Sequence, residues 1–414
     1  MTRRLQFWFD FSCPYAYLAS TQVEALAART GAALDPQPML LGGVFRAHET
    51  PQKLFATLGA AKAKHNSADL ERFAALFGVR LEMPGGHPLR TVTALRALLV
   101  VGAPFLPLAH RFFAAYWARG IDLSTKEGVA RVLTEAGHDP GPILEKAESA
   151  EIKDELRRRT DEAIALGIFG APAFVVDEQL YFGQDRLDLV ERALGGAPLP
   201  LADPPGPVSA PVDVWFDYSS PFSYFGWAQI DRCLPGVARP KPMLLGAVFK
   251  EVGQVNVPLL AQSPAKQRYL ATDTIRQAEK AGVPFRWPSR FPMNTVLALR
   301  LTIAAEAHLR PEGRRLITRF YQAYWAEDRD LADPAVLATI LTEEGYDAER
   351  LLAAAQSTEV KETLRSLTGE AVAAGVFGAP TFVVHHPGRT PSLYWGSDRI
   401  ELAALSSAGL GRVD

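Results

Sequence analysis

The sequence predicts an α/β protein made of two tandem copies of one domain, each with a large helical insertion. The chain has 414 residues, more than a single hydrophobic core usually supports. It also repeats itself: FWFDFSCPYAYLAS in the first half recurs as VWFDYSSPFSYFGW in the second, and GIFGAPAFVV recurs as GVFGAPTFVV. Finally, short strand-like segments alternate with longer helix-like segments within each copy.

A stretch rich in proline and glycine separates the two copies. GGAPLPLADPPGPVSAP, residues 195–211, contains few large apolar residues, which is typical of an extended linker. We therefore expect one domain at residues 1–196, a linker at 197–210 and a second domain at 211–414. The two halves are expected to pack together as a pseudo-dimer.

The elements of the first copy can be read in order. LQFWFDF alternates like a buried strand, and PYAYLASTQVEALAART has helical spacing that stops at Gly31. PMLL, residues 38–41, is predicted to be a second short strand, and residues 51–167 are predicted to be mostly helical. AFVVD and QLYFG then predict two strands joined by a turn, followed by the helix RLDLVERALG. This order describes a thioredoxin-like sheet interrupted by a helical insertion.

Composition excludes several classes of function. The chain is 48% hydrophobic and 22% charged with a formal net charge of −2, so we expect no nucleic-acid or membrane partner. The first apolar run is broken at Asp10, too early for a signal peptide or a membrane span, and the two cysteines suit a reducing compartment. A cytoplasmic protein is therefore expected. The eight histidines form no metal-binding pattern, and no phosphate-binding loop appears.

Cys13 and Ser220 occupy the same place in the two openings, each directly before a proline. Proline favours the first position of a helix, so the preceding residue is the predicted N-cap. A serine there can be a simple cap. A cysteine caps poorly, but a helix N-terminus stabilises a thiolate, so Cys13 is a candidate nucleophile, with a buried structural thiol as the alternative.

Two further motifs recur in both copies. Gly-Ala-Pro before an apolar strand places Pro172 and Pro380 at strand starts, and the sequence leaves their cis or trans state open. A cis bond would turn the amide and carbonyl of the preceding alanine outward to pair with an extended peptide. FGQDR and WGSDR each contain an aspartate that could cap the last helix or bind an α-amino group.

Taken together, the motifs of the second copy resemble one family. DYSSPFSY, LLGAVFKEVGQVNVP, SPAKQRYLATD, FPMNTVLALR, FGAPTFVV and WGSDR occur in the order found in 2-hydroxychromene-2-carboxylate isomerases and kappa-class glutathione transferases. These proteins belong to the DsbA-like branch of the thioredoxin superfamily. The resemblance covers nearly all of the second copy and implies glutathione as cofactor and a small aromatic, conjugated substrate.

The resemblance also implies roles for particular residues. Ser220 would hold the sulfur of glutathione as an electrostatic stabiliser. The remaining implied contacts are to the tripeptide by Asn256 and Lys266, to its cysteinyl part by the backbone at Ala379 and Pro380, and to its γ-glutamyl end by Ser397 and Asp398. In the first copy the matching positions are Lys62, Ala171, Pro172 and Asp185.

The first copy departs from the family pattern. It has no asparagine matching Asn256, and Arg90 replaces Asn294. Cys13 resembles the attacking cysteine of DsbA-like oxidoreductases, but Ala16 stands at the resolving position, which leaves only a monothiol route through a mixed disulfide. A glutathione-dependent isomerase or transferase is the leading hypothesis. The alternatives are a monothiol oxidoreductase that uses Cys13 and a non-catalytic, paired binding module.

Overall fold

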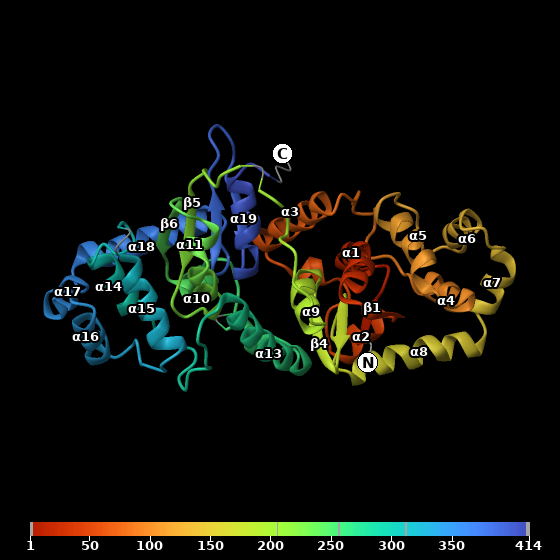
Figure 1. Cartoon of the computed structure of the whole chain (residues 1–414), viewed down its shortest axis with the longest axis horizontal. Helices are drawn as coiled ribbons and strands as arrows, with labels where there is room; N and C mark the ends of the chain where they lie inside the picture. Colours follow the sequence, from red (N-terminus) through yellow and green to blue (C-terminus); the bar gives the residue numbers. More distant parts are fainter. Residues whose placement is uncertain (1–2, 205, 256, 311–312, 411–414) are drawn as a thin grey trace.

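The computed structural model describes residues 3–204, 206–255, 257–310 and 313–410, and these form two four-stranded sheets (Figure 1). The strand orders are β2-β1-β3-β4 and β6-β5-β7-β8, with the first pair of each sheet parallel and the others antiparallel. The strands are β1 (Arg4–Phe9), β2 (Ala33–Pro38), β3 (Ala173–Val176), β4 (Gln179–Phe182), β5 (Val212–Phe216), β6 (Ala238–Pro242), β7 (Thr381–Val384) and β8 (Ser392–Trp395). The predicted fold class, two tandem thioredoxin-like domains, is confirmed.

The first domain places its helical insertion between β2 and β3, at one end of the molecule (Figure 1). Its helices are α1 (Pro14–Thr30), α2 (Leu41–Ala47), α3 (Ala60–Leu76), α4 (Val92–Val101), α5 (Phe105–Trp117), α6 (Lys126–Glu135), α7 (Pro140–Ala147), α8 (Ala150–Ala165) and α9 (Leu187–Ala193). Short 3₁₀ turns occur at η1 (Leu54–Thr57) and η2 (Gln184–Arg186).

The second domain repeats this arrangement at the opposite end (Figure 1). Its helices are α10 (Pro221–Ala228), α11 (Ile230–Cys233), α12 (Leu245–Glu251), α13 (Pro264–Ala281), α14 (Val296–Ala304), α15 (Arg314–Trp325), α16 (Pro334–Glu343), α17 (Ala348–Ala354), α18 (Thr358–Ala373) and α19 (Ile400–Ser407), with 3₁₀ turns at η3 (Pro258–Ala261) and η5 (Ser397–Arg399). Among the described residues, no helix is long and apolar enough to cross a lipid bilayer.

The position predicted for the second strand is wrong. The strand is β2, which ends at Pro38, and most of PMLL leads into α2 instead. The segment ALDPQP lacks a strand-like apolar pattern because β2 is an edge strand, where prolines are tolerated. The following helix starts at Leu41, whose backbone N–H donates to the buried carboxylate of Asp10 at 2.8 Å.

The two domains contact each other through α3 and α13, which lie between the sheets (Figure 1). From α3, Arg72 donates to the carbonyl of Leu393 in β8 at 2.8 Å. From α13, Arg276 donates to the carbonyl of Leu180 in β4 at 2.7 Å. Because these residues match between the copies, the contact has approximate twofold symmetry.

Candidate functional site

Ser220 and Cys13 have nearly the same backbone conformation, and their side chains bond to equivalent atoms. The Ser220 hydroxyl accepts from the N–H of Ser223 at 3.2 Å, so the predicted N-cap is confirmed, and it donates to the carbonyl of Ala379 at 2.8 Å. The Cys13 thiol makes no cap but donates to the carbonyl of Ala171 at 3.0 Å. Each side chain therefore joins a helix N-terminus to the loop before β3 or β7.

The surroundings of Cys13 do not favour a thiolate. Burial raises the pKa of this thiol to about 12, and the backbone amides of Ala16 and Tyr15 lower it by less. The expectation that the start of α1 would stabilise negative sulfur is therefore wrong here, because desolvation outweighs the helix terminus. Burial likewise raises the pKa of Cys233 to about 11.

The Gly-Ala-Pro motifs adopt the cis form in both domains, at Ala171–Pro172 and at Ala379–Pro380. The two alanine carbonyls, which the sequence predicts to face an extended peptide, each already accept one hydrogen bond, from Cys13 and from Ser220. The amide of Ala379 makes no hydrogen bond within the part of the chain that the structure describes. It is the group left to pair with an extended ligand.

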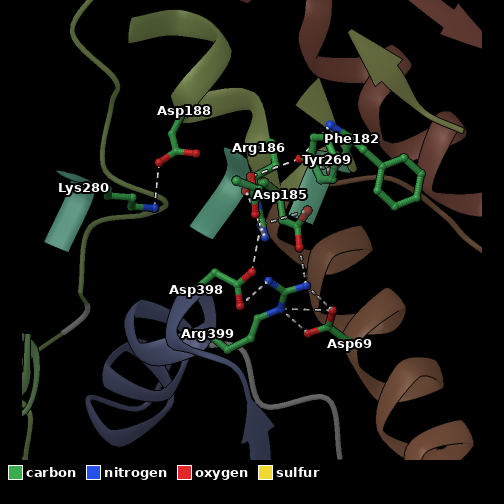
Figure 2. Close-up of polar contacts among 10 residues, drawn as sticks. Asp69, Phe182, Asp185, Arg186, Asp188, Tyr269, Lys280, Asp398 and Arg399 are labelled. Carbon is green, nitrogen blue, oxygen red and sulfur yellow. Dashed lines mark hydrogen bonds and ion pairs between the residues drawn. The ribbon is translucent and has the colours of Figure 1, made fainter. Parts of the chain in front are cut away.

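The turns before the last helix of each domain hold Asp185 and Asp398. Neither aspartate caps its helix, so that expectation is wrong. Asp398 accepts from Nη1 of Arg186 at 2.8 Å, and Asp185 accepts from Nη2 of Arg399 at 2.8 Å, so each carboxylate pairs with the other domain (Figure 2). Burial disfavours the charged form of Asp398, but Arg399 and Arg186 outweigh it and hold its pKa below the usual range. Ser397, beside Asp398, is buried.

The two predicted lysines, Lys62 and Lys266, influence each other electrostatically across the domain contact. Lys62 of α3 places Nζ 5.0 Å from the ring centroid of Trp395 in the other domain. Burial, and then the charge of Lys62, lower the pKa of Lys266 to about 8. Lys62 therefore contacts the second domain, although it belongs to a helix of the first. Asn256, the other residue predicted to reach the tripeptide, lies outside the described residues.

A buried carboxylate holds the segment that carries Ser220. Asp217 accepts from the N–H of Ser219 at 2.9 Å, from the N–H of Leu245 at 2.8 Å and from the hydroxyl of Thr295 at 2.6 Å. It thus joins the end of β5 to the starts of α12 and α14. We did not single out Asp217 from the sequence, although the signal was present: an aspartate directly follows an apolar strand in both copies.

Sequence reasoning also missed Arg186 and Arg399. In FGQDR and WGSDR the arginines, and not only the aspartates, make contacts that cross between the domains. A signal existed, because an aspartate recurs at matched positions in α3 and α13, as Asp69 and Asp273. Both are buried and pair with these arginines. The described residues contain no group of three or more His, Cys, Asp or Glu side chains placed to hold a metal ion.

The geometry suits an extended, zwitterionic thiol ligand at the second domain. Ser220 supplies a hydroxyl at a helix N-terminus, Ala379 supplies an amide with no hydrogen bond among the described residues, and Asp398 supplies a carboxylate in a turn. These groups match a thiol, a peptide carbonyl and an ammonium group. The residues present therefore fit glutathione.

A family match agrees with the fold, and several known proteins are similar in sequence. The DSBA-like thioredoxin domain matches residues 4–195 and again 211–406. A 2-hydroxychromene-2-carboxylate isomerase from Sphingobium xenophagum is 32% identical over 47% of this chain and 99% of its own length. Glutathione S-transferase kappa 1 from Rattus norvegicus is 30% identical over 48% of this chain and 91% of its own length. A solved 2-hydroxychromene-2-carboxylate isomerase is 25% identical over 46% of this chain and 94% of its own, with a TM-score of 0.43.

Each relative thus corresponds to about half of the chain, while the family match occurs twice. The chain belongs to the DSBA-like thioredoxin domain family and carries two tandem copies of that domain, similar to 2-hydroxychromene-2-carboxylate isomerases and kappa-class glutathione transferases.

Proposed function

We propose that this protein is a glutathione-dependent isomerase or transferase, with its glutathione site in the second domain and a small aromatic, conjugated substrate. The observation that carries the proposal is the contrast between Ser220, a neutral hydroxyl donor at the start of α10, and Cys13, a buried thiol with a raised pKa. The substrate class follows the names of the relatives. When bound, glutathione would supply a thiolate that adds to a conjugated substrate and later leaves.

The residues of the second domain divide the binding of the tripeptide between them. Ser220 would hold the sulfur, and the amide of Ala379, next to Pro380, would pair with the cysteinyl carbonyl. Ser397 and Asp398 would hold the γ-glutamyl end. Lys266, with Asn256, would reach the remaining part of the tripeptide, and a lysine whose pKa is lowered to about 8 still carries charge at neutral pH.

The Ser220 hydroxyl has a single proton, which it now donates to the carbonyl of Ala379. To stabilise a ligand thiolate, this O–H has to turn away from Ala379 toward the sulfur. The N–H of Ser223 continues to donate to the same oxygen, which makes the hydroxyl a better donor. Ser220 thus lowers the pKa of the ligand thiol without itself becoming a nucleophile.

The first domain would act as the other half of a covalent pseudo-dimer. It keeps Lys62, Ala171, Pro172 and Asp185, but a neutral thiol replaces the serine, so we propose a modified or degenerate site there. The matched contacts that α3 makes with β8 and α13 makes with β4 support this arrangement.

Calorimetric titration of the reduced protein with reduced glutathione tests the proposal. We expect one site per chain in the wild type, a large loss of affinity in Ser220→Ala, and wild-type affinity in the matched variant Cys13→Ser. Turnover of a 2-hydroxychromene-2-carboxylate substrate should follow the same pattern. Unchanged binding and turnover in Ser220→Ala would contradict the proposal, and no binding at millimolar glutathione would favour the paired binding module.

A further inference from the structure

Two arginines and four aspartates form a buried ion network where the domains meet (Figure 2). The first domain contributes Asp69, Asp185 and Arg186, and the second contributes Asp273, Asp398 and Arg399. Four carboxylates therefore share two guanidinium groups. Because buried charge is unfavourable unless it is balanced, this excess of negative charge suits a cationic ligand.

Two of the carboxylates are accessible to a ligand. The side chains of Asp185 and Asp398 are 19% and 18% exposed, whereas those of Asp69 and Asp273 are 4% and 1% exposed. Asp69 and Asp273 each accept from Nε and Nη2 of one arginine. Asp185 accepts from the same Nη2 of Arg399, and Asp398 accepts from Nη1 of Arg186. A ligand ammonium group would therefore meet Asp398 in the second domain and Asp185 in the first.

Unpaired donors in the same region also point to a ligand. Nη1 of Arg399 is buried and makes no hydrogen bond among the described residues, although it lies 3.2 Å from Oδ1 of Asp398. The side-chain amide of Gln184, next to Asp185 in sequence, is also buried without a hydrogen-bond partner in the described part of the chain. Surplus carboxylates beside unpaired N–H groups match both charged ends of an α-amino acid head.

Arg399 links the carboxylates of the two domains. Its Nη2 donates to Asp185 at 2.8 Å, while its Nη1 lies 3.2 Å from Asp398. The negative charge of Asp185 therefore balances part of the positive charge that Asp398 experiences. Without it, Arg399 would repel a ligand ammonium group from Asp398 more strongly.

We propose that the first domain sets the affinity of the second-domain site for a ligand ammonium group, with Asp185 acting through Arg399. This inference rests on the proposed function, in which the ammonium group belongs to the γ-glutamyl end of glutathione. Asp185 is a positioning residue here, since it acts on the ligand of the other domain through an arginine. An ammonium group bound at Asp185 would offset the charge of that carboxylate and so weaken binding at Asp398. This weakening would be mutual between the two sites.

Calorimetry on the full chain tests this coupling with two probes: reduced glutathione, and an analogue of glutathione that lacks the α-amino group. The site measured is the one that Ser220→Ala abolishes. Asp185→Asn should raise the Kd of glutathione at this site about five- to tenfold and change the Kd of the analogue by less than about twofold. A merely structural role for Asp185 would affect both probes equally.

Asp188→Asn is the matched control. Asp188 lies three residues from Asp185, loses the same charge, and pairs across the same domain contact with Lys280 at 2.6 Å, but it makes no ion pair with Arg399 (Figure 2). We expect it to change either Kd by less than about twofold. Should Asp185→Asn fail to fold, Asp69→Asn removes the other carboxylate from Arg399 and should change the selectivity in the same direction.

The possible outcomes separate the two proposals. Equal effects of Asp185→Asn on glutathione and on the analogue, or equal effects of Asp185→Asn and Asp188→Asn, would overturn the coupling and leave the proposed function standing. Failure of the wild-type chain to bind glutathione would overturn both.

Discussion

A hydroxyl at Ser220 and a thiol at Cys13 occupy equivalent positions, and their surroundings decide what each can do. Both donate to the carbonyl before a cis proline. A hydroxyl can assist a ligand thiolate while it stays neutral, so burial does not harm that role. A thiol reacts only as the thiolate, and burial suppresses this form. The same position therefore suits cofactor binding in one domain better than nucleophilic chemistry in the other.

Cys13 is predicted to react slowly with alkylating reagents in the native protein. With a pKa of about 12, its thiolate fraction is far below that of free cysteine, whose pKa is about 8.5. In a Cys233→Ser background, the rate of iodoacetamide modification should rise about tenfold per pH unit through pH 9 without a plateau. The denatured chain provides the control and should react like free cysteine. A plateau below about pH 9 would restore the monothiol oxidoreductase as a candidate.

His65 is predicted to make the protein less stable in acid. Its Nε2 accepts from the N–H of Trp395 at 3.1 Å, and burial lowers its pKa from 6.5 to about 4. Below pH 6.5 the unfolded chain takes up this proton while the folded chain does not, so stability falls until about pH 4, by roughly 3 kcal/mol in total. Chemical unfolding at pH 7 and at pH 4.5 measures the change.

The second domain offers a matched substitution for this test. Tyr269 stands at the position of His65, and its hydroxyl accepts from the N–H of Phe182 at 3.0 Å. His65→Tyr should therefore lose less stability than the wild type between the two pH values. An identical loss in both proteins would mean that other groups cause the acid sensitivity.

At the level of elements, local pattern predicted most of the fold. Apolar alternation identified β1 and β5, and Ser-Pro identified the start of α10, because these signals involve neighbours in sequence. β2 was misplaced because an edge strand with two prolines has little apolar pattern. The ion pairs of Asp69 could not be predicted, since its partner Arg399 lies 330 residues away in sequence and periodicity does not report partners.

The cores of the two domains differ at one pair of matched positions, which is polar in the second domain and apolar in the first. In the second domain, the hydroxyls of Tyr218 and Thr302 lie 2.7 Å apart and are buried. The first domain has Phe11 and Leu98 at these positions. Neither pair leaves a buried polar group without a partner, because the two hydroxyls bond to each other and the apolar pair has none.

This replacement predicts strong coupling in a double-mutant cycle. Thr302→Leu alone should cost about 2 kcal/mol or more, since it leaves the hydroxyl of Tyr218 buried without a partner. Tyr218→Phe alone should cost about 1 kcal/mol, because Thr302 keeps its bond to the carbonyl of Ala298. The double variant, which recreates the pair of the first domain, should be less destabilised than Thr302→Leu alone. Additive losses in urea unfolding would argue against coupling.

At the scale of the whole molecule, covalent linkage lets the two halves diverge while their contact stays symmetric. Arg72 and Arg276 make matched bonds to opposite domains. Matched residues can differ even within this contact, since His65 and Tyr269 each bond to the opposite domain, while Cys13 and Ser220 differ at the helix starts. Under the proposed function, a first domain with a modified site would still contribute contacts to the second, which gives a physical reason for both copies to remain in one chain.

Arg186 and Arg399 of the buried ion network are predicted to make the two domains unfold together as one cooperative unit. Arg399→Leu would leave Asp69 and Asp185 without their main cation, and removing one partner of a buried ion pair costs about 3 to 5 kcal/mol. Calorimetry should show a lower Tm and a heat-absorption peak broadened or split into two. Arg232→Leu is the control, because Arg232 is 62% exposed and its pair with Glu401 contributes less than about 1 kcal/mol. If both variants unfold like the wild type, the ion network does not couple the unfolding of the two domains.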